Sequence, residues 1–105
     1  MGTYVLMTRL SPDAIGDPRG RKAVAKEWKK RVDKGCPEVE WLAHYALLGP
    51  YDFMDIYEAP NDQVAYKVSM ISRASGALMA ESWPAIAWER YLEVADEVRS
   101  TLGKK

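Results

Sequence analysis

The sequence is poor in the residues that bind metals or form cross-links. Its 105 residues include one cysteine, Cys36, and one histidine, His44. A single cysteine excludes a disulfide within the chain and favours a reducing compartment, so we expect a cytoplasmic protein. These two residues are too few for a His/Cys zinc site. Glycine-rich phosphate loops and paired metal-ligand carboxylates are also missing, so we expect no metal and no cofactor.

Net charge and long apolar runs are missing as well. Fifteen basic residues balance fifteen acidic ones, so no positive surplus is present to neutralise a nucleic-acid backbone. No apolar stretch approaches the roughly 20 residues of a membrane-spanning helix, and the N-terminus lacks a signal-peptide pattern. We therefore expect neither nucleic acid nor a membrane as partner. The length and the 48% of hydrophobic residues predict a single globular domain over residues 1–105.

Periodicity and breaker residues divide the chain into strands and helices. The expected strands are residues 3–10, 38–48, 51–59 and 77–87, the last broken at Pro84. The expected helices are residues 19–34, 62–74 and 88–102, with Gly35 as a left-handed stop and Asn61 or Asp62 as a cap. This β-α-β-β-α-β order with an extra C-terminal helix predicts an α+β, ferredoxin-like fold. Right-handed crossovers place the first and third strands at the centre of an antiparallel sheet.

The hairpin around Gly49-Pro50 distributes side chains between the two faces of the sheet. If Leu48 lies opposite Tyr51, His44 lies opposite Asp55 and alternate residues share a face. The face expected to pack under the helices carries Ala43, Tyr45, Leu47, Met54 and Ile56. The face expected to be open carries Leu42, His44, Ala46, Phe53, Asp55 and Tyr57. An open face of this apolar character indicates an interface or a ligand groove, and we expect a homodimer or higher even-numbered oligomer with a cavity between facing sheets.

Several segments resemble the GYD-domain family. They are Thr3-Tyr4-Val5, Leu48-Gly49-Pro50-Tyr51-Asp52-Phe53, Glu58-Ala59-Pro60-Asn61-Asp62 and Glu81-Ser82-Trp83-Pro84-Ala85-Ile86. The Gly-Tyr-Asp that names the family stands here as Gly49, Tyr51 and Asp52, with Pro50 inserted. The resemblance covers nearly the whole chain and implies a ferredoxin-like fold of the dimeric α/β-barrel kind. Because the family is largely uncharacterised, the resemblance implies almost no chemistry.

His44 and Asp55 form the one pair that suits acid–base chemistry. A carboxylate can fix the tautomer of an imidazole and raise its basicity, so His44 would be the general base and Asp55 its orienting partner. Tyr57 follows on the same face and would donate to a substrate oxygen. The structural alternative is a cross-strand polar pair, or a pair satisfied at a dimer seam.

The other candidates are ligand contacts. Asp52 would accept hydrogen bonds from turn amides, and Tyr51 would cover an edge or touch a ligand. Glu81 and Trp83 share a face of the fourth strand, and Arg9 on the first strand is a candidate ion-pair partner of Glu81. The complete set of candidate ligand contacts is Arg9, Leu42, Tyr51, Phe53, Tyr57, Glu81 and Trp83.

Three hypotheses of function follow from these residues. The first is a homo-oligomeric binding or accessory protein that takes a small apolar or aromatic molecule in an aromatic-lined pocket. The second is a cofactor-free enzyme, similar to a monooxygenase or isomerase, that uses His44 and Asp55 on an apolar or aromatic substrate; this one is an analogy of fold alone. The third is a structural subunit that serves assembly or docks on a partner protein.

Overall fold

The computed structural model of the chain describes residues 1–103. Its elements are β1 (Gly2–Leu10), α1 (Pro12–Ile15), α2 (Arg21–Gly35), β2 (Glu40–Ala46), β3 (Phe53–Ala59), α3 (Asp62–Ala74), β4 (Ala77–Ala85) and α4 (Trp88–Thr101). The strands form one antiparallel sheet in the order β2-β3-β1-β4. The predicted ferredoxin-like fold is therefore confirmed, with β1 and β3 at the centre and an extra C-terminal helix.

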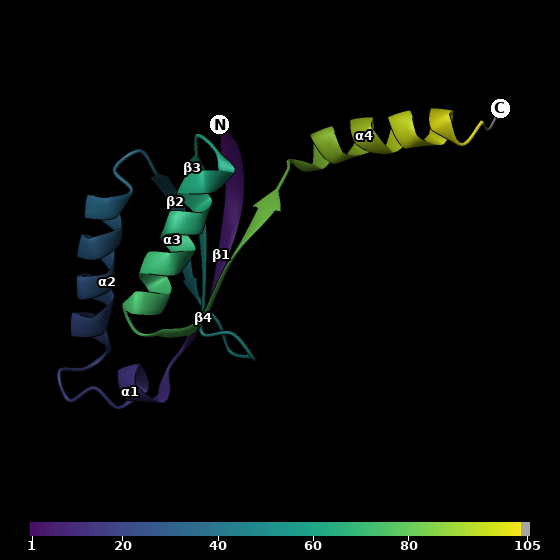
Figure 1. Cartoon of the computed structure of the whole chain (residues 1–105). Coiled ribbons are helices and arrows are strands. Elements are labelled where there is room, and N and C mark those ends of the chain that lie inside the picture. The colour runs from purple at the N-terminus through teal and green to yellow at the C-terminus, as the bar shows by residue number, and fades with distance from the viewer. Residues whose placement is uncertain (104–105) are drawn as a thin grey trace.

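Local chemistry explains where the helices begin. The hydroxyl of Ser11 accepts a hydrogen bond from the Ala14 amide at 3.1 Å and caps α1. The side chain of Asn61 accepts one from the Val64 amide at 3.1 Å and caps α3, in agreement with the sequence. Both α2 and α3 lie on the same side of the sheet, whereas α4 continues from the end of β4 and extends away from the domain (Figure 1).

Two expectations about breaker residues are wrong. Gly35 does not adopt a left-handed conformation, because the described glycines with positive φ are Gly20, Gly76 and Gly103. A Cβ at Gly35 would lie 2.5 Å from Cδ1 of Ile71, so this glycine allows α2 to approach α3 closely. Strand β4 also runs unbroken through Pro84. Because β4 is an edge strand, it tolerates a residue without an amide hydrogen.

The register of the β2–β3 hairpin agrees with the sequence prediction at the His44–Asp55 pair. His44 lies opposite Asp55 and Tyr45 opposite Met54, as expected. The register shifts between Trp41 and Ala43, so that Trp41 rather than Leu42 lies opposite Tyr57. Such a bulge places one extra residue in the strand and changes which side chain faces the core. Leu42 is consequently 49% exposed and does not pair with Tyr57 on the face that was predicted to carry both.

The assignment of the two faces is inverted relative to the expectation. Asp55 and Tyr57 are buried beneath the helices, and His44 lies in the same helix-covered layer as Trp28 of α2. The alternation correctly placed His44, Asp55 and Tyr57 on one face but carried no information about which face the helices cover. The deciding contacts come from β1, whose fully buried Leu6 lies opposite Asp55.

The core lies between the sheet and α2 and α3. Its largest fully buried side chains are Leu6, Val32, Cys36, Tyr57, Val68 and Ser72. Burial raises the pKa of the Cys36 thiol, which keeps this cysteine protonated and unreactive. Tyr57 packs on Tyr4 with ring centroids 5.4 Å apart and on Trp41 at 5.0 Å. The core therefore contains an aromatic layer that extends from β1 across β3 to β2.

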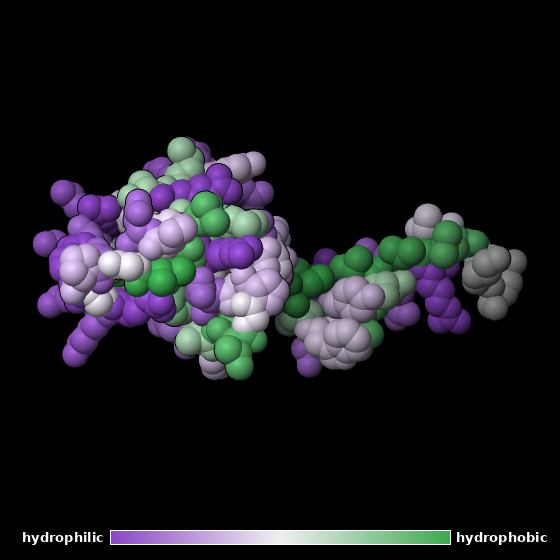
Figure 2. Space-filling model, turned by 90° about the horizontal axis from the view of Figure 1, so that it is seen from below, coloured by the Kyte–Doolittle hydropathy of each residue, from purple (hydrophilic) through white to green (hydrophobic). Residues whose placement is uncertain are grey.

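The sheet face away from the helices is uncovered. The register places Val5, Met7, Tyr45, Met54, Ile56 and Trp83 on it, and of these Tyr45 and Trp83 are about half exposed whereas Met7 is buried among its neighbours. Helix α4 also lacks cover, since none of its residues is buried and Trp88, Tyr91 and Leu92 are each about half exposed or more. Figure 2 shows apolar residues along this helix, apart from the rest of the molecule. None of the helices within residues 1–103 has the length and apolarity to span a membrane.

Asp52 connects the hairpin to the end of β1, which gives a testable prediction. Its carboxylate accepts a hydrogen bond from the Leu10 amide at 2.8 Å, and its own amide donates to the Thr8 carbonyl at 2.8 Å. Asp52→Ala should lower the free energy of unfolding by about 1–3 kcal/mol, because the Leu10 amide loses a charged acceptor. Urea unfolding followed by circular dichroism measures this loss. The matched variant Asp52→Asn keeps an acceptor oxygen and should lose less; equal losses would contradict this role.

Candidate functional site

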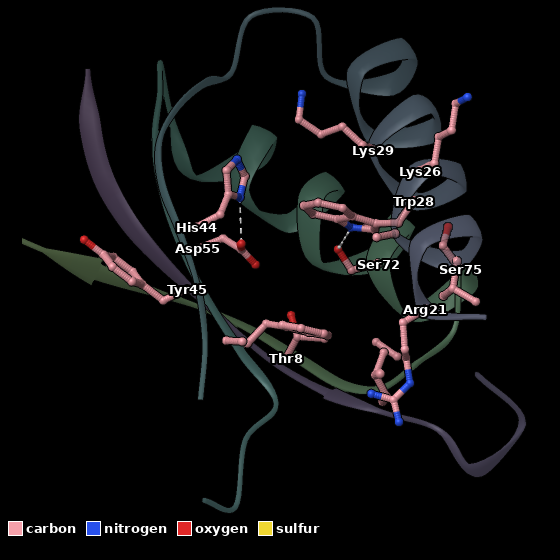
Figure 3. A pocket seen from close by; sticks show the side chains of 16 residues that line it. Thr8, Arg21, Lys26, Trp28, Lys29, His44, Tyr45, Asp55, Ser72 and Ser75 are labelled. Atoms are coloured by element: carbon pink, nitrogen blue, oxygen red, sulfur yellow. Dashed lines mark hydrogen bonds and ion pairs between the residues drawn. The ribbon is translucent and has the colours of Figure 1, made fainter. Parts of the chain in front are cut away.

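A pocket of about 520 Å³ lies between α2 and the sheet. Trp28, Val24 and Ala25 contribute its wall from α2, and Phe53 and Leu10 contribute apolar surface from β3 and β1. Polar groups come from the hydroxyl of the buried Thr8 and from the paired side chains of His44 and Asp55. Ser72 and Ser75 line the pocket from the end of α3. Figure 3 shows His44 and Asp55 on one side of this pocket and Trp28 with Ser72 on the other. An apolar cavity with a few polar groups is typical of a small-molecule site.

His44 and Asp55 are in direct contact. Nδ1 of His44 lies 2.7 Å from Oδ1 of Asp55 across the β2–β3 pair. An ionised carboxylate only accepts hydrogen bonds, so with Asp55 ionised the proton of the imidazole is held on Nδ1. Nε2 then carries a free lone pair, and within residues 1–103 it has no hydrogen-bond partner. The side chain of His44 is 47% exposed, so this nitrogen is open to solvent or ligand.

Aromatic rings fix the position of the imidazole. Trp41 stacks on His44 with ring centroids 5.4 Å apart, and Trp28 meets it edge-on at 6.4 Å. Trp28 itself is held by a hydrogen bond from its Nε1 to the Ser72 hydroxyl at 2.8 Å. The Ser72 hydroxyl donates in turn to the Val68 carbonyl at 2.7 Å. The imidazole is therefore oriented by one carboxylate and two indole rings.

Burial makes the Asp55 carboxylate costly to ionise. Its residue is only 7% exposed, and desolvation raises the pKa of Asp55, with the hydrogen bond from His44 lowering it in part. A buried carboxylate of this kind is stabilised when the imidazole beside it is protonated. Proton uptake at Nε2 of His44 would therefore be stabilised by the Asp55 carboxylate on the other side of the ring, which is the arrangement of a general base with an orienting carboxylate.

A second cluster lies on the uncovered face of the sheet. Oε1 of Glu81 accepts hydrogen bonds from the Tyr51 hydroxyl at 3.2 Å and from Nε1 of Trp83 at 3.0 Å. The rings of Tyr51 and Trp83 meet edge-on at 6.0 Å. Burial raises the pKa of Tyr51, the Glu81 charge raises it further, and the positive charge of Arg9 lowers it in part.

The structure divides the sequence-predicted residues among separate places. His44, Asp55 and Phe53 line the pocket together. Tyr51, Glu81 and Trp83 form the cluster on the opposite face, and the expected ion pair of Glu81 with Arg9 is not among the contacts of residues 1–103.

Tyr57 and Leu42 lie away from both places. Tyr57 is fully buried in the core, where its hydroxyl lies 2.7 Å from the Ser82 hydroxyl and burial raises its pKa to about 12. It therefore cannot donate to a substrate in the pocket as proposed. Leu42 lies at the bulge of β2 and is not among the residues that line the pocket between α2 and the sheet.

A family model named GYD domain matches residues 4–95. The chain belongs to the GYD-domain family. Among curated proteins, none matches it. Two solved structures are similar to this chain. The structure of FFRP-DM1 has 20% sequence identity and a TM-score of 0.52. The structure of the hypothetical protein PHS023 from Pyrococcus horikoshii has 19% sequence identity and a TM-score of 0.50. The alignments cover 82% and 83% of this chain, and 100% and 92% of the respective structures. At this identity the likeness supports the ferredoxin-like fold alone.

In this GYD-domain chain, the pocket residues that the sequence did not single out come mainly from the helices. Neither Trp28 nor Trp41 is among the candidate residues of the sequence analysis, yet both contact His44. Trp28 lies on the apolar stripe of α2, so its inward direction was readable from the sequence. The contact of Trp41 depended on the bulge after it, which no residue pattern indicated.

The tautomer of His44 tests the geometry of this pair. As the one histidine of this GYD-domain protein, it gives a single set of imidazole signals in long-range ¹H–¹⁵N NMR spectra. We expect the neutral ring to carry its proton on Nδ1, because Asp55 accepts it there. Asp55→Ala should shift the ring toward the Nε2-protonated form, whereas Asp55→Asn keeps an acceptor and should shift it less. A wild-type ring protonated on Nε2 would contradict the observed pairing.

Proposed function

We propose that this protein is a homo-oligomeric small-molecule-binding or accessory protein whose ligand occupies the pocket between α2 and the sheet. The observation that carries the proposal is the pocket itself, with the His44–Asp55 pair at its side. Its volume of about 520 Å³ falls in the range of roughly 300–1,000 Å³ common for ligand sites. The expected location between facing sheets is replaced by a site within one domain, because His44 and Asp55 lie under the helices.

The lining residues favour an apolar or aromatic ligand. Trp28 and Phe53 present flat aromatic surface, and Val24, Ala25 and Leu10 add aliphatic surface. Desolvation of such surfaces drives the binding of apolar molecules, and aromatic rings favour offset or edge-on packing with a ligand ring. A few polar groups then fix the orientation of the ligand.

A cofactor-free enzyme is the second candidate, and the His44–Asp55 contact favours it. In that case Nε2 of His44 would abstract a proton from a substrate in the pocket, and Asp55 would stabilise the resulting imidazolium. Trp28 would position the substrate in place of Tyr57, which is buried. The binding protein and the enzyme differ in one observable, namely whether a bound compound is chemically changed.

The oligomeric part of the proposal is supported by the amount of exposed surface. A compact monomer of 11.9 kDa exposes about 6,000 Å², whereas this chain exposes 7429 Å². The excess of roughly 1,500 Å² is larger than the roughly 800 Å² that one partner buries in a standard interface. The radius of gyration is 16.7 Å, against about 13 Å expected for a compact domain of this length.

A second copy of the chain is the occupant that we propose for the uncovered surfaces. The open sheet face with Met54 and Ile56 and the α4 stripe with Tyr91 and Leu92 belong to the same chain. A two-fold association therefore buries both surfaces without any other component. Docking of a different protein on these surfaces is the third hypothesis of function, and the measurement of mass below separates the two.

The first experiment tests the pocket. Thermal-shift screening with neutral aromatic and quinone-like compounds should raise the melting temperature of the wild type. Ala25→Trp fills the pocket and should remove the shift, whereas the matched variant Lys30→Trp, on the exposed side of the same helix, should keep it. Mass spectrometry of each hit after incubation detects turnover, which in an enzyme would disappear in His44→Gln while binding remained. A screen without hits would contradict both candidates.

The second experiment tests the assembly. Light scattering at micromolar concentration should give at least twice the chain mass of 11.9 kDa. Ile56→Glu on the sheet and Leu92→Glu on α4 should each lower that mass, because a charge would be buried at the interface. The control Tyr66→Glu changes an aromatic residue of α3 that is 71% exposed and should leave the mass unchanged. A monomeric wild type would overturn the homo-oligomer, and capture by another protein would then support the docking hypothesis.

A further inference from the structure

The α2 side of the pocket carries positive charge. Arg21, Lys26 and Lys29 line the pocket from this helix, and Asp55 is the one acidic residue among its lining side chains in residues 1–103 (Figure 3). The Asp55 carboxylate lies 2.7 Å from Nδ1 of His44, so its negative charge is directed to the imidazole. The pocket therefore offers cations to a ligand without an opposing free carboxylate.

Two of these three cations have no protein partner in the described part of the chain. Lys29 is engaged, because its Nζ lies 2.8 Å from the Asp33 carboxylate and 6.0 Å from the centre of the Trp41 ring. Arg21 and Lys26 form no ion pair within residues 1–103. Other cations of the first half of the chain, such as Arg19 and Arg31, are paired with Asp17 or Glu27. Lys22, Lys30 and Lys34 of α2 also form no ion pair within residues 1–103, but they do not line the pocket, so Arg21 and Lys26 are the unpaired cations of α2 at the pocket.

We propose that the pocket binds an aromatic carboxylic acid, an inference that rests on the small-molecule-binding function proposed above. The aromatic body of the ligand packs against Trp28 and Phe53, and its carboxylate faces Arg21, while Lys26, whose ammonium points toward the opposite end of the pocket in Figure 3, adds a more distant positive charge. A guanidinium donates two parallel hydrogen bonds to the two oxygens of a carboxylate, and an ammonium adds a point charge. A neutral aromatic compound of the same shape uses only the apolar walls, so the pocket discriminates in favour of the acid.

The test compares two probes that differ only in charge. The probes are 2-naphthoate and 2-naphthamide, which share the same rings, and isothermal titration calorimetry on the full chain gives both dissociation constants. We expect the acid to bind roughly three- to tenfold more tightly than the amide at low salt, the range that two partly exposed charges supply. This advantage should shrink at high salt, because ions screen exposed charges.

Variants identify the residues responsible. The double variant Arg21→Gln/Lys26→Met should remove the advantage of 2-naphthoate and leave the affinity for 2-naphthamide unchanged. The matched double variant Lys22→Met/Lys30→Met removes two cations of the same helix that do not line the pocket. It should preserve most of the advantage, since both charges are more distant from the ligand.

Each outcome separates this inference from the proposed function. Equal binding of both probes to the wild type would overturn the carboxylic-acid class and leave small-molecule binding intact. An advantage that survives in Arg21→Gln/Lys26→Met would overturn the assignment of these two residues. Failure of both probes to bind, together with a neutral screen without hits, would overturn the proposed function as well.

Discussion

The contact of Trp28 with the sheet is the interaction on which the rest of the structure depends. Its Nε1 donates to the Ser72 hydroxyl at 2.8 Å, which joins α2 to α3. Its ring meets Trp41 at 5.4 Å and His44 at 6.4 Å, which joins both helices to β2. The cavity lies beside this indole, which lines it together with other residues of α2 and of the sheet. The same side chain thus stabilises the domain and forms a wall of the candidate site.

The His44–Asp55 pair is a polar contact at the edge of an apolar core, with Asp55 buried and His44 half exposed. Burying a carboxylate costs free energy unless it is paired, and the 2.7 Å contact with His44 supplies that partner. A pair inside the core would be purely structural, whereas His44 is 47% exposed and faces a cavity. Asp55 therefore contributes to the stability of β3 and at the same time orients the one imidazole of the protein. Because His44 is held in place by Asp55 and is also exposed to the cavity, the pair suits both a binding site and a catalytic site.

The element order and register could be predicted from the sequence because local signals were strong. Asn61 before an apolar helical stripe marked the start of α3, and the turn at Gly49-Pro50 placed His44 opposite Asp55. The three-dimensional site was predicted less completely. Phe53, His44 and Asp55 lie in one pocket, but Tyr57 is in the core and Leu42 at a bulge. A bulge depends on how two strands twist against their neighbours, so no pattern in residues 41–43 indicated it.

The sequence by itself determined the ferredoxin-like topology, the GYD-domain resemblance and the sharing of one face by His44, Asp55 and Tyr57. Alternation along a strand fixes which side chains lie together, because successive residues point to opposite faces. Only the tertiary structure decided that this face lies under α2 and α3. That choice depends on the long-range packing that brings Val32 and Trp28 of α2 into one core cluster with Leu6 of β1 and Tyr57 of β3, and such packing has no local signature. It moved the candidate site from a seam between sheets to a pocket within the domain, and it left a different apolar face and α4 uncovered.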